Sequence, residues 1–115
     1  MIIPAEFYRA FVAYMPILCV DLIIRNGNKV LLVKRANEPL KGEWWIPGGR
    51  VFKGESLIDA ARRKAITEVR QEIEPKFIGI YEGRFETSAQ GLPCHGVSIV
   101  FEGCSTKTPM IDAEH

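Results

Sequence analysis

The most regular pattern of apolar and polar positions runs from residue 55 to residue 71, where neither proline nor glycine interrupts the chain. Apolar residues recur there at the spacing of one helical face, which predicts an amphipathic helix from about Glu55 to Gln71. Gly54 and Glu55 start this helix, with Ser56 as an alternative cap, and Pro75 stops it. The residues expected to face the core are Ile58, Ala61, Ala65, Ile66 and Val69.

Two glycines follow Pro47 and precede this helix, so the backbone there can bend sharply and approach a ligand closely. At about 100° per residue, Lys64, Glu68 and Glu72 form one row at the edge of the apolar face. A helix N-terminus attracts anions, and carboxylates along a helix can hold a cation. A glycine loop that leads into this helix therefore suits a metal-bound diphosphate.

Apolar runs before and after the helix predict strands. The first two are joined by the turn 26–28, which predicts an antiparallel hairpin. A short helix over Pro4–Tyr14 carries a broad apolar face, which packs either on the sheet of its own domain or against a second subunit. The expected strands cover residues 17–25, 29–35, 50–52, 77–85 and 94–102.

Asp21 lies inside an otherwise apolar run, and a carboxylate in that place must be paired or must face a site. A salt bridge to a neighbouring lysine or arginine is the simpler interpretation, and contact with a ligand is the other. His95 begins a strand, where a histidine is either incidental or in contact with a substrate.

The composition indicates one soluble globular domain over residues 1–115, with 47% hydrophobic and 25% charged residues. A net charge of +1 gives no general attraction to polyanions, so no nucleic-acid partner is expected. No apolar run reaches the roughly 20 residues of a membrane span, and no signal peptide is evident, so we expect a cytoplasmic protein. Three cysteines without metal-ligand spacing are expected to be buried reduced thiols.

The loop and helix at residues 49–71 resemble the Nudix box, G-x5-E-x7-R-E-U-x-E-E-x-G-U, where U is aliphatic. The matching residues are Gly49, Glu55, Arg63 and Glu68, and the departing ones are Lys64, Thr67, Arg70 and Gln71. The preceding WWIPGGRV and the strand pair before it also resemble this family. The resemblance implies an α/β fold, a Nudix-type α/β/α sandwich with a mixed sheet.

Within that family the retained positions are similar to those of GDP-mannose mannosyl hydrolase. The flank KRANEPLKGEWWIPGGRV, Pro16 and Asp21 upstream, and the acidic segment that ends at His115 agree with this branch. Its His-bearing motif is not evident over 77–85, where Arg84 is the nearest polar residue. In the family a further strand and a C-terminal helix follow, which leaves open whether the 115 residues are a truncated chain or a fragment.

This resemblance implies Mg²⁺-dependent hydrolysis of a nucleoside diphosphate linked to a small molecule such as a sugar, by a homodimer. It places Mg²⁺ on the carboxylate of Glu68 and the backbone at Gly48. It also implies that Gly49, Glu55 and Arg63 support the box, with Arg63 orienting a glutamate.

For the other site residues, the resemblance assigns Arg35 and Arg50 to the diphosphate and Asp21 to the sugar. His115 is then the general base, because imidazole has a pKa near 6.5. With one box carboxylate left, water is expected to attack the anomeric carbon of the sugar. Two alternatives remain, a pyrophosphohydrolase of ADP-ribose or nucleoside triphosphates with Glu72 as a second ligand, and a non-catalytic nucleotide-binding domain.

Overall fold

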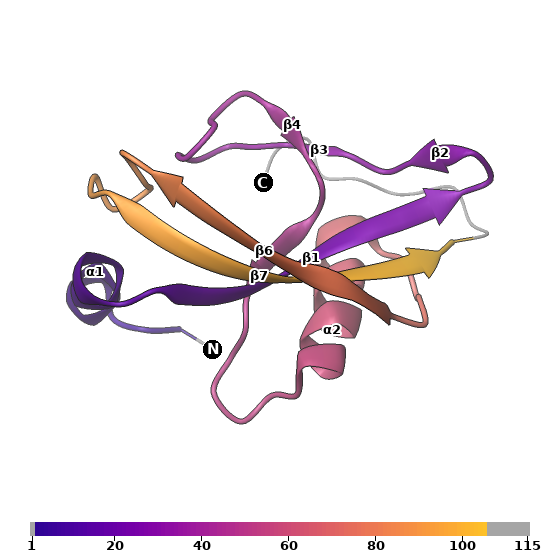
Figure 1. Ribbon diagram of the computed structural model, residues 1–115, viewed down its shortest axis with the longest axis horizontal. Helices are drawn as coiled ribbons and strands as arrows, with labels where there is room; N and C mark the ends of the chain where they lie inside the picture. The colour runs from indigo at the N-terminus through magenta and orange to yellow at the C-terminus, as the bar shows by residue number, and fades with distance from the viewer. Residues whose placement is uncertain (1, 106–115) are drawn as a thin grey trace.

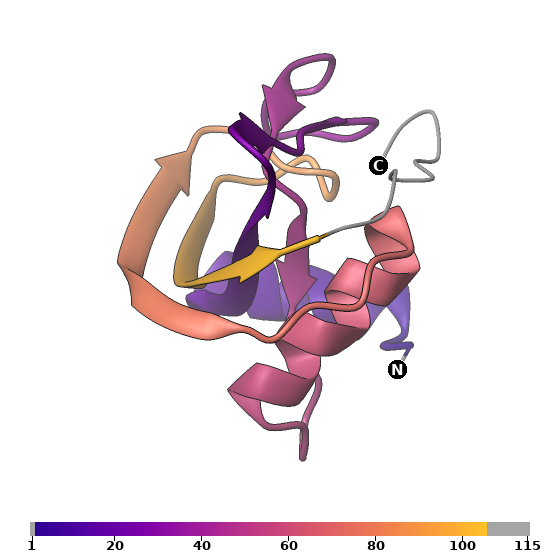
Figure 2. The ribbon, with the colours of Figure 1, turned by 90° about the vertical axis from the view of Figure 1, so that its right-hand side faces the viewer.

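The computed structural model describes residues 2–105, and His115 lies outside the described residues. It contains two helices and a curved mixed sheet (Figures 1 and 2). The helices are α1 (Ala5–Tyr14) and α2 (Leu57–Val69). The strands are β1 (Ile17–Asn26), β2 (Lys29–Val30), β3 (Val33–Lys34), β4 (Trp44–Trp45), β5 (Gly48–Arg50), β6 (Lys76–Phe85) and β7 (Cys94–Cys104).

The main sheet is organised around β1. It pairs in parallel with β7 along nearly its whole length, and β7 pairs antiparallel with β6. On its other edge β1 pairs with β5 at Cys19–Asp21 and with β2 at Arg25–Asn26. Strands β3 and β4 form a separate two-stranded sheet. The predicted α/β fold with a mixed sheet is therefore confirmed.

The core lies between the sheet and α2, which runs along one side of the sheet in Figure 2. The alternation along β1 directs Val20, Leu22 and Ile24 toward this core, where they are almost fully buried. Because each buried side chain removes apolar surface from water, this contact supplies much of the folding free energy. The face that α2 presents consists of Ala60, Ala61, Ala65 and Val69.

Two details of the predicted helix were wrong. Ile58 and Ile66 are 43% and 50% exposed, and Ala60 is buried in their place. The buried face is made of small residues, which allow the helix axis to lie close to the sheet. The helix also ends at Val69, because Arg70 adopts a left-handed conformation with φ of 55°. Ser56, the alternative cap, does begin the helix, and its Oγ accepts a hydrogen bond from Asp59 N.

The predicted hairpin is correct only at its turn. Residues 29–35 do not form one strand, because β2 pairs with β1 for two residues and the chain then turns away to pair β3 with β4. The edge of β1 that a longer hairpin would use is occupied by β5. The strand expected at 50–52 accordingly starts earlier, at Gly48.

The N-terminal helix forms as predicted, with Pro4 just before its first residue. Val12 is buried where α1 packs against β7, whereas the large side chains of Phe7 and Tyr14 are 56% and 86% exposed. Neither described helix is long and apolar enough to cross a membrane. The three cysteines are free, as expected, but the expected burial was wrong, because Cys104 is exposed and Cys19 and Cys94 are only partly buried. The cytoplasmic location stays a prediction.

The pairing of β5 with β1 generates the first test. A Cβ at Gly48 would lie 2.1 Å from Asp21 Oδ1 and 2.5 Å from the backbone oxygen of Val20. We expect Gly48→Ala to lower the free energy of unfolding by about 2–3 kcal/mol, because backbone cannot move aside cheaply. Urea denaturation followed by circular dichroism measures this loss.

Gly49→Ala is the matched control. Its Cβ would meet the end of the Lys64 side chain, 2.6 Å from Cε, and that flexible end can shift. We expect a loss below about 1 kcal/mol for this variant. Equal losses for the two variants would contradict the account of this strand pair.

Candidate functional site

One cavity of about 390 Å³ gathers most of the residues singled out in the sequence. Cys19 and Asp21 alternate along β1 with the core residues Val20 and Leu22, so they face the side of the sheet away from α2. The cavity lies on that side, and Glu68 lines it although it belongs to α2. The predicted site residues on its walls are Asp21, Arg35, Gly48, Gly49, Arg50 and Glu68.

Arg50, the last residue of β5, lies against two aromatic rings. Its guanidinium carbon is 5.3 Å from the centroid of Tyr8 in α1 and 5.0 Å from that of Phe52. These cation–π contacts and a side-chain hydrogen bond with Tyr8 hold the guanidinium in place. Arg50 is thus placed in the cavity wall with a planar fork suited to phosphate oxygens.

Arg35 reaches the same cavity from the other direction, just after β3. Its Nε donates to the carbonyl oxygen of Pro39 at 2.6 Å, which fixes the loop that also lines the cavity. Gln90 belongs to another loop that lines the cavity. Arg9 of α1 donates through Nη1 to its carbonyl oxygen, at 2.5 Å. Helix α1 and both loops therefore help to shape the site.

Asp21 is the carboxylate that β1 contributes to the cavity wall. Burial raises its pKa above the ordinary value of 3.8, while a hydrogen bond with Ser98 and the positive charge of Arg35 act in the opposite direction. The structure thus supplies both of the environments considered for Asp21, a neighbouring arginine and a cavity wall.

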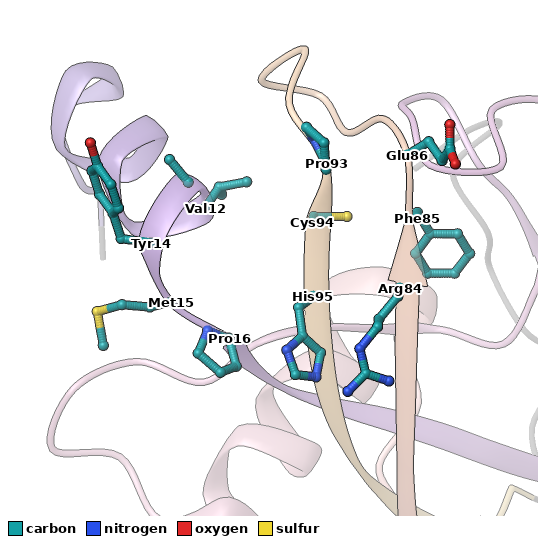
Figure 3. A pocket seen from close by; sticks show the side chains of 11 residues that line it. Val12, Tyr14, Met15, Pro16, Arg84, Phe85, Glu86, Pro93, Cys94 and His95 are labelled. Atoms are coloured by element: carbon teal, nitrogen blue, oxygen red, sulfur yellow. The ribbon is translucent and has the colours of Figure 1, made fainter.

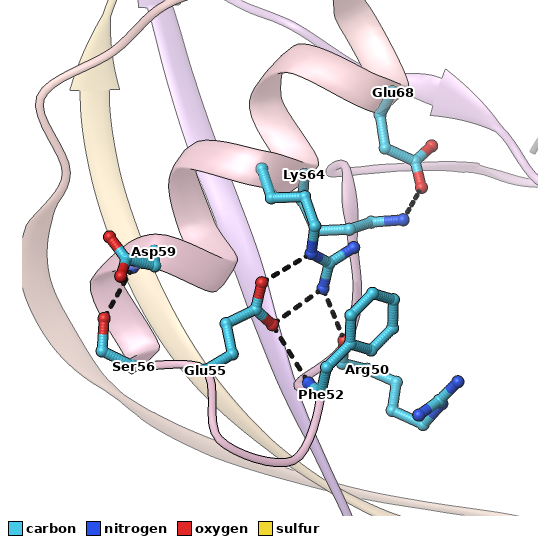
Figure 4. A network of polar contacts seen from close by, with 8 residues as sticks. Arg50, Phe52, Glu55, Ser56, Asp59, Lys64 and Glu68 are labelled. Carbon is cyan, nitrogen blue, oxygen red and sulfur yellow. Dashed lines mark hydrogen bonds and ion pairs between the residues drawn. The ribbon is translucent and has the colours of Figure 1, made fainter. Parts of the chain in front are cut away.

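The box residues Glu55 and Arg63 form a bidentate ion pair (Figure 4). Arg63 Nε lies 2.7 Å from Glu55 Oε2, and Nη2 lies 3.1 Å from Oε1. Glu55 Oε1 also accepts from Phe52 N at 3.0 Å. The hydrogen bond with Arg63 is the main reason that the pKa of Glu55 lies below its ordinary value of 4.5. Together these contacts tie the start of α2 to the loop after β5.

The hydrogen bonds between β1 and β5 determine where the carbonyl of Gly48 points. Leu22 N donates to Pro47 O at 2.8 Å, and Val51 N donates to Leu18 O at 3.0 Å. Hydrogen-bonded and non-hydrogen-bonded pairs alternate in an antiparallel ladder. Gly48 therefore falls at a non-hydrogen-bonded position, and its carbonyl is directed away from β1.

Arg50 occupies the next position of the same kind, and its carbonyl oxygen accepts from Arg63 Nη2 at 3.0 Å. This contact agrees with the alternation of hydrogen-bonded and non-hydrogen-bonded pairs between β1 and β5. It shows that the outer edge of β5 faces α2. The carbonyl of Gly48 is directed to the same edge, and Glu68 of α2 lines the cavity beside Gly48 and Gly49. Glu68 also forms an ion pair with Lys64 (Figure 4).

These oxygen donors suit Mg²⁺, which prefers carboxylate and carbonyl oxygens and often binds through one or two carboxylates plus substrate phosphates. Within residues 2–105 no group of three or more His, Cys, Asp or Glu side chains is placed to hold a metal ion. A cation on Glu68 and Gly48 would complete its coordination with water and with oxygens of the substrate.

A wider hollow of about 710 Å³ lies between the end of α1 and the adjoining ends of β6 and β7 (Figure 3). It shares Val12, Phe85, Cys94 and His95 with the site cavity. His95 therefore lines both spaces. Its position at a strand end had left open whether it lies at the site.

Several residues of the site were not predicted from the sequence. Tyr8 was expected only to pack against the sheet or a second subunit, but it lies under Arg50. Ser98 beside Asp21 carried no signal, because a serine within a strand is unremarkable. Lys64 was placed in one row with Glu68 and noted as a departure from the box, but its ion pair with Glu68 was not predicted.

The sequence pattern of the NUDIX domain family matches residues 15–115. The chain is 41% identical over 103 residues to the low-salt glycan biosynthesis protein Agl8 of Haloferax volcanii, covering 87% of this chain and 66% of that protein. It is 38% identical over 91 residues to an ADP-ribose pyrophosphatase of Methanocaldococcus jannaschii, covering 75% and 49%. This chain therefore spans less than two thirds of the length of either relative.

Among solved structures, a MutT NUDIX hydrolase from Burkholderia pseudomallei is similar in fold. The superposition has a TM-score of 0.72 at 24% identity and covers 84% of this chain and 74% of that one.

The Glu55–Arg63 pair generates a pH-dependent prediction. We expect Glu55→Gln to lower the free energy of unfolding at pH 7 by about 1–2 kcal/mol, because a charge-assisted hydrogen bond is lost. The lowered pKa of Glu55 means that this stabilisation is present above the unfolded pKa near 4.5 and is lost as the pH falls through the folded value. Urea denaturation from pH 7 downward should therefore show the difference from wild type narrowing below pH 4.5.

The matched control is Glu86→Gln, since Glu86 is exposed. It should change the unfolding free energy by less than about 0.5 kcal/mol. A difference between Glu55→Gln and wild type that stays constant with pH would refute this role for the ion pair.

Proposed function

The chain belongs to the NUDIX family, and from this premise we propose that it hydrolyses a nucleoside diphosphate-linked sugar to nucleoside diphosphate and free sugar. The observation that carries the proposal is the composition of the cavity. Two arginines, Arg35 and Arg50, converge there with one box carboxylate, Glu68. A site of this composition is better suited to hold a diphosphate leaving group than to activate water at phosphorus.

The proposal includes one divalent cation, Mg²⁺, held by Glu68 and the carbonyl of Gly48. When bound, such a cation neutralises negative charge on the diphosphate. Arg35 and Arg50 donate to the diphosphate oxygens and stabilise the charge that develops as the bond to the sugar breaks. Gly48 and Gly49 carry no side chain that would keep the diphosphate from the backbone.

Asp21 is proposed to face the sugar. Burial raises its pKa and makes the charged carboxylate costly, and the hydroxyl groups of a sugar would donate hydrogen bonds to it. His115, the general base that the family resemblance suggests, lies outside the described residues, so its role stays a prediction. Glu55, Arg63 and Gly49 are proposed to hold the box in shape.

The main alternative is attack at phosphorus, as in a pyrophosphohydrolase. The similarity to an ADP-ribose pyrophosphatase supports this alternative. The pyrophosphohydrolase alternative includes Glu72 as a second metal ligand. Glu72 lies beyond the end of α2 and lines a different hollow, with Glu74 and Lys76. A second carboxylate from this position is therefore not supported, and non-catalytic binding of a nucleotide is the remaining alternative.

The position of water attack decides between the two hydrolytic reactions. We expect the full-length protein with Mg²⁺ to convert a GDP-linked hexose to GDP and free hexose. In ¹⁸O-labelled water, mass spectrometry should find the label in the sugar. GDP-mannose, GDP-glucose, ADP-ribose and nucleoside triphosphates form the substrate panel.

The matched control is Glu68→Gln, which keeps the shape of the side chain and removes its charge. It should lower the Mg²⁺-dependent rate by about 100-fold or more while leaving the circular dichroism spectrum unchanged. Label in the phosphate would instead place the protein among the pyrophosphohydrolases. Tight nucleotide binding without turnover would identify a binding domain.

We also propose that α1 contributes to a homodimer interface. Its exposed aromatic side chains Phe7, Phe11 and Tyr14 leave an apolar surface that a second copy would cover. Light scattering at micromolar concentration should give the mass of two chains. Phe7→Ser combined with Tyr14→Ser should shift the protein toward the monomer, and a monomeric wild type would rule the dimer out.

A further inference from the structure

Lys64 occupies the place where the Nudix box has a glutamate directly after its arginine. Its Nζ forms an ion pair with Oε1 of Glu68, four residues further along α2 (Figure 4). Both side chains are largely buried, with 17% of Lys64 and 11% of Glu68 exposed. A positive charge therefore already lies on the carboxylate that the proposed function assigns to a divalent cation.

The absence of a side chain at Gly49 gives this lysine its place. A Cβ on Gly49 would lie 2.6 Å from Lys64 Cε and 2.8 Å from Nζ. The ammonium group thus lies between β5 and α2, on the face of β5 toward which a side chain at Gly49 would point. The carbonyl of Gly48 is directed to the outer edge of β5, which also faces the helix.

We propose that Lys64 is a resident counter-cation that competes with a divalent cation for Glu68 and keeps the affinity of the site for the free cation low. This inference rests on the proposed function for one point, that Glu68 is the cation ligand. Lys64 is accordingly a positioning residue, because it acts through Glu68.

Two physical effects of Lys64 each lower the affinity of Glu68 for a free divalent cation. An ammonium group repels a divalent ion at short range, and solvent screens this repulsion less at a partly buried site than at the surface. A carboxylate that already has a cationic partner also gains less from a new one, because its buried charge is already compensated.

The flexible four-carbon stem of lysine explains how the site could still accept a metal. The ammonium can move aside when a metal-bound diphosphate enters, and the phosphate charge offsets the crowding of cations. The divalent cation would therefore enter together with its diphosphate instead of occupying the protein beforehand.

Binding of Mn²⁺ alone tests the inference without substrate turnover. Electron paramagnetic resonance of free Mn²⁺ at low ionic strength should show Lys64→Met binding Mn²⁺ about tenfold or more tighter than wild type. Lys64→Arg retains the charge and should stay within about threefold of wild type. Adding Glu68→Gln to Lys64→Met should abolish the gain.

Lys29→Met is the matched control, because it removes the same charge from an exposed position on β2. It should change Mn²⁺ affinity by less than about twofold, since solvent and salt screen a surface charge. If Lys64→Met does not fold, Lys64→Gln removes the charge while keeping a polar group beside Glu68, and the same gain is expected.

Unchanged or weaker Mn²⁺ binding by the folded neutral variant would overturn the inference. So would a complete lack of binding in both wild type and variant, because no cation would then compete with Lys64. The Mn²⁺ measurement and the ¹⁸O-labelling experiment test different hypotheses, so each can fail without the other. Label in the phosphate would refute attack at carbon while a tenfold gain in Mn²⁺ affinity still supported the role of Lys64.

Discussion

The pairing of the short strand β5 with the edge of β1 is the constraint on which the rest of this site depends. Three residue pairs place Gly48 opposite Asp21 and Arg50 opposite Cys19. Strand alternation then sends these side chains into the cavity, while the neighbouring residues face α2. The pairing tolerates no side chain at Gly48, because a Cβ would overlap Asp21 and the backbone of Val20.

The same pairing also fixes the polar groups at the outer edge of β5. Arg63 uses one side of its guanidinium for Glu55 and reaches the carbonyl of Arg50 with the other. This arrangement joins strand, loop and helix by charge-assisted hydrogen bonds, which are stronger than neutral ones. Arg63 thereby acts through the position of the loop, and the proposed substrate contacts belong to the arginines in the cavity.

Three positively charged side chains lie at this site. Arg35 and Arg50 line the cavity, and Lys64 lies behind its carboxylate Glu68. With a net charge of only +1 over the whole chain, this concentration is local. Local cationic charge of this kind suits the proposed diphosphate group, and Lys64 beside Glu68 is the basis of the proposal that metal and substrate enter together.

The sequence alone determined those features that depend on local spacing. The apolar period after the glycine loop identified α2, with Ser56 as one of the possible caps. The family resemblance implied that Arg63 supports Glu55 or Glu68, and the structure shows it bonded to Glu55. Extended apolar runs likewise located β1, β6 and β7 to within two residues. The spacing of apolar residues along the chain is sufficient to predict these elements, because it reflects the local period of a helix or a strand.

Only the tertiary structure decided features that depend on which distant segments meet. The edge of β1 could accept either the rest of the hairpin or β5, and local preference did not distinguish them. The close approach of α2 buried alanines and left Ile58 and Ile66 exposed, because packing distance is a property of two surfaces. For the same reason no pattern in the sequence could place Tyr8 beneath Arg50, since 42 residues of chain separate them and only the fold brings α1 to the end of β5.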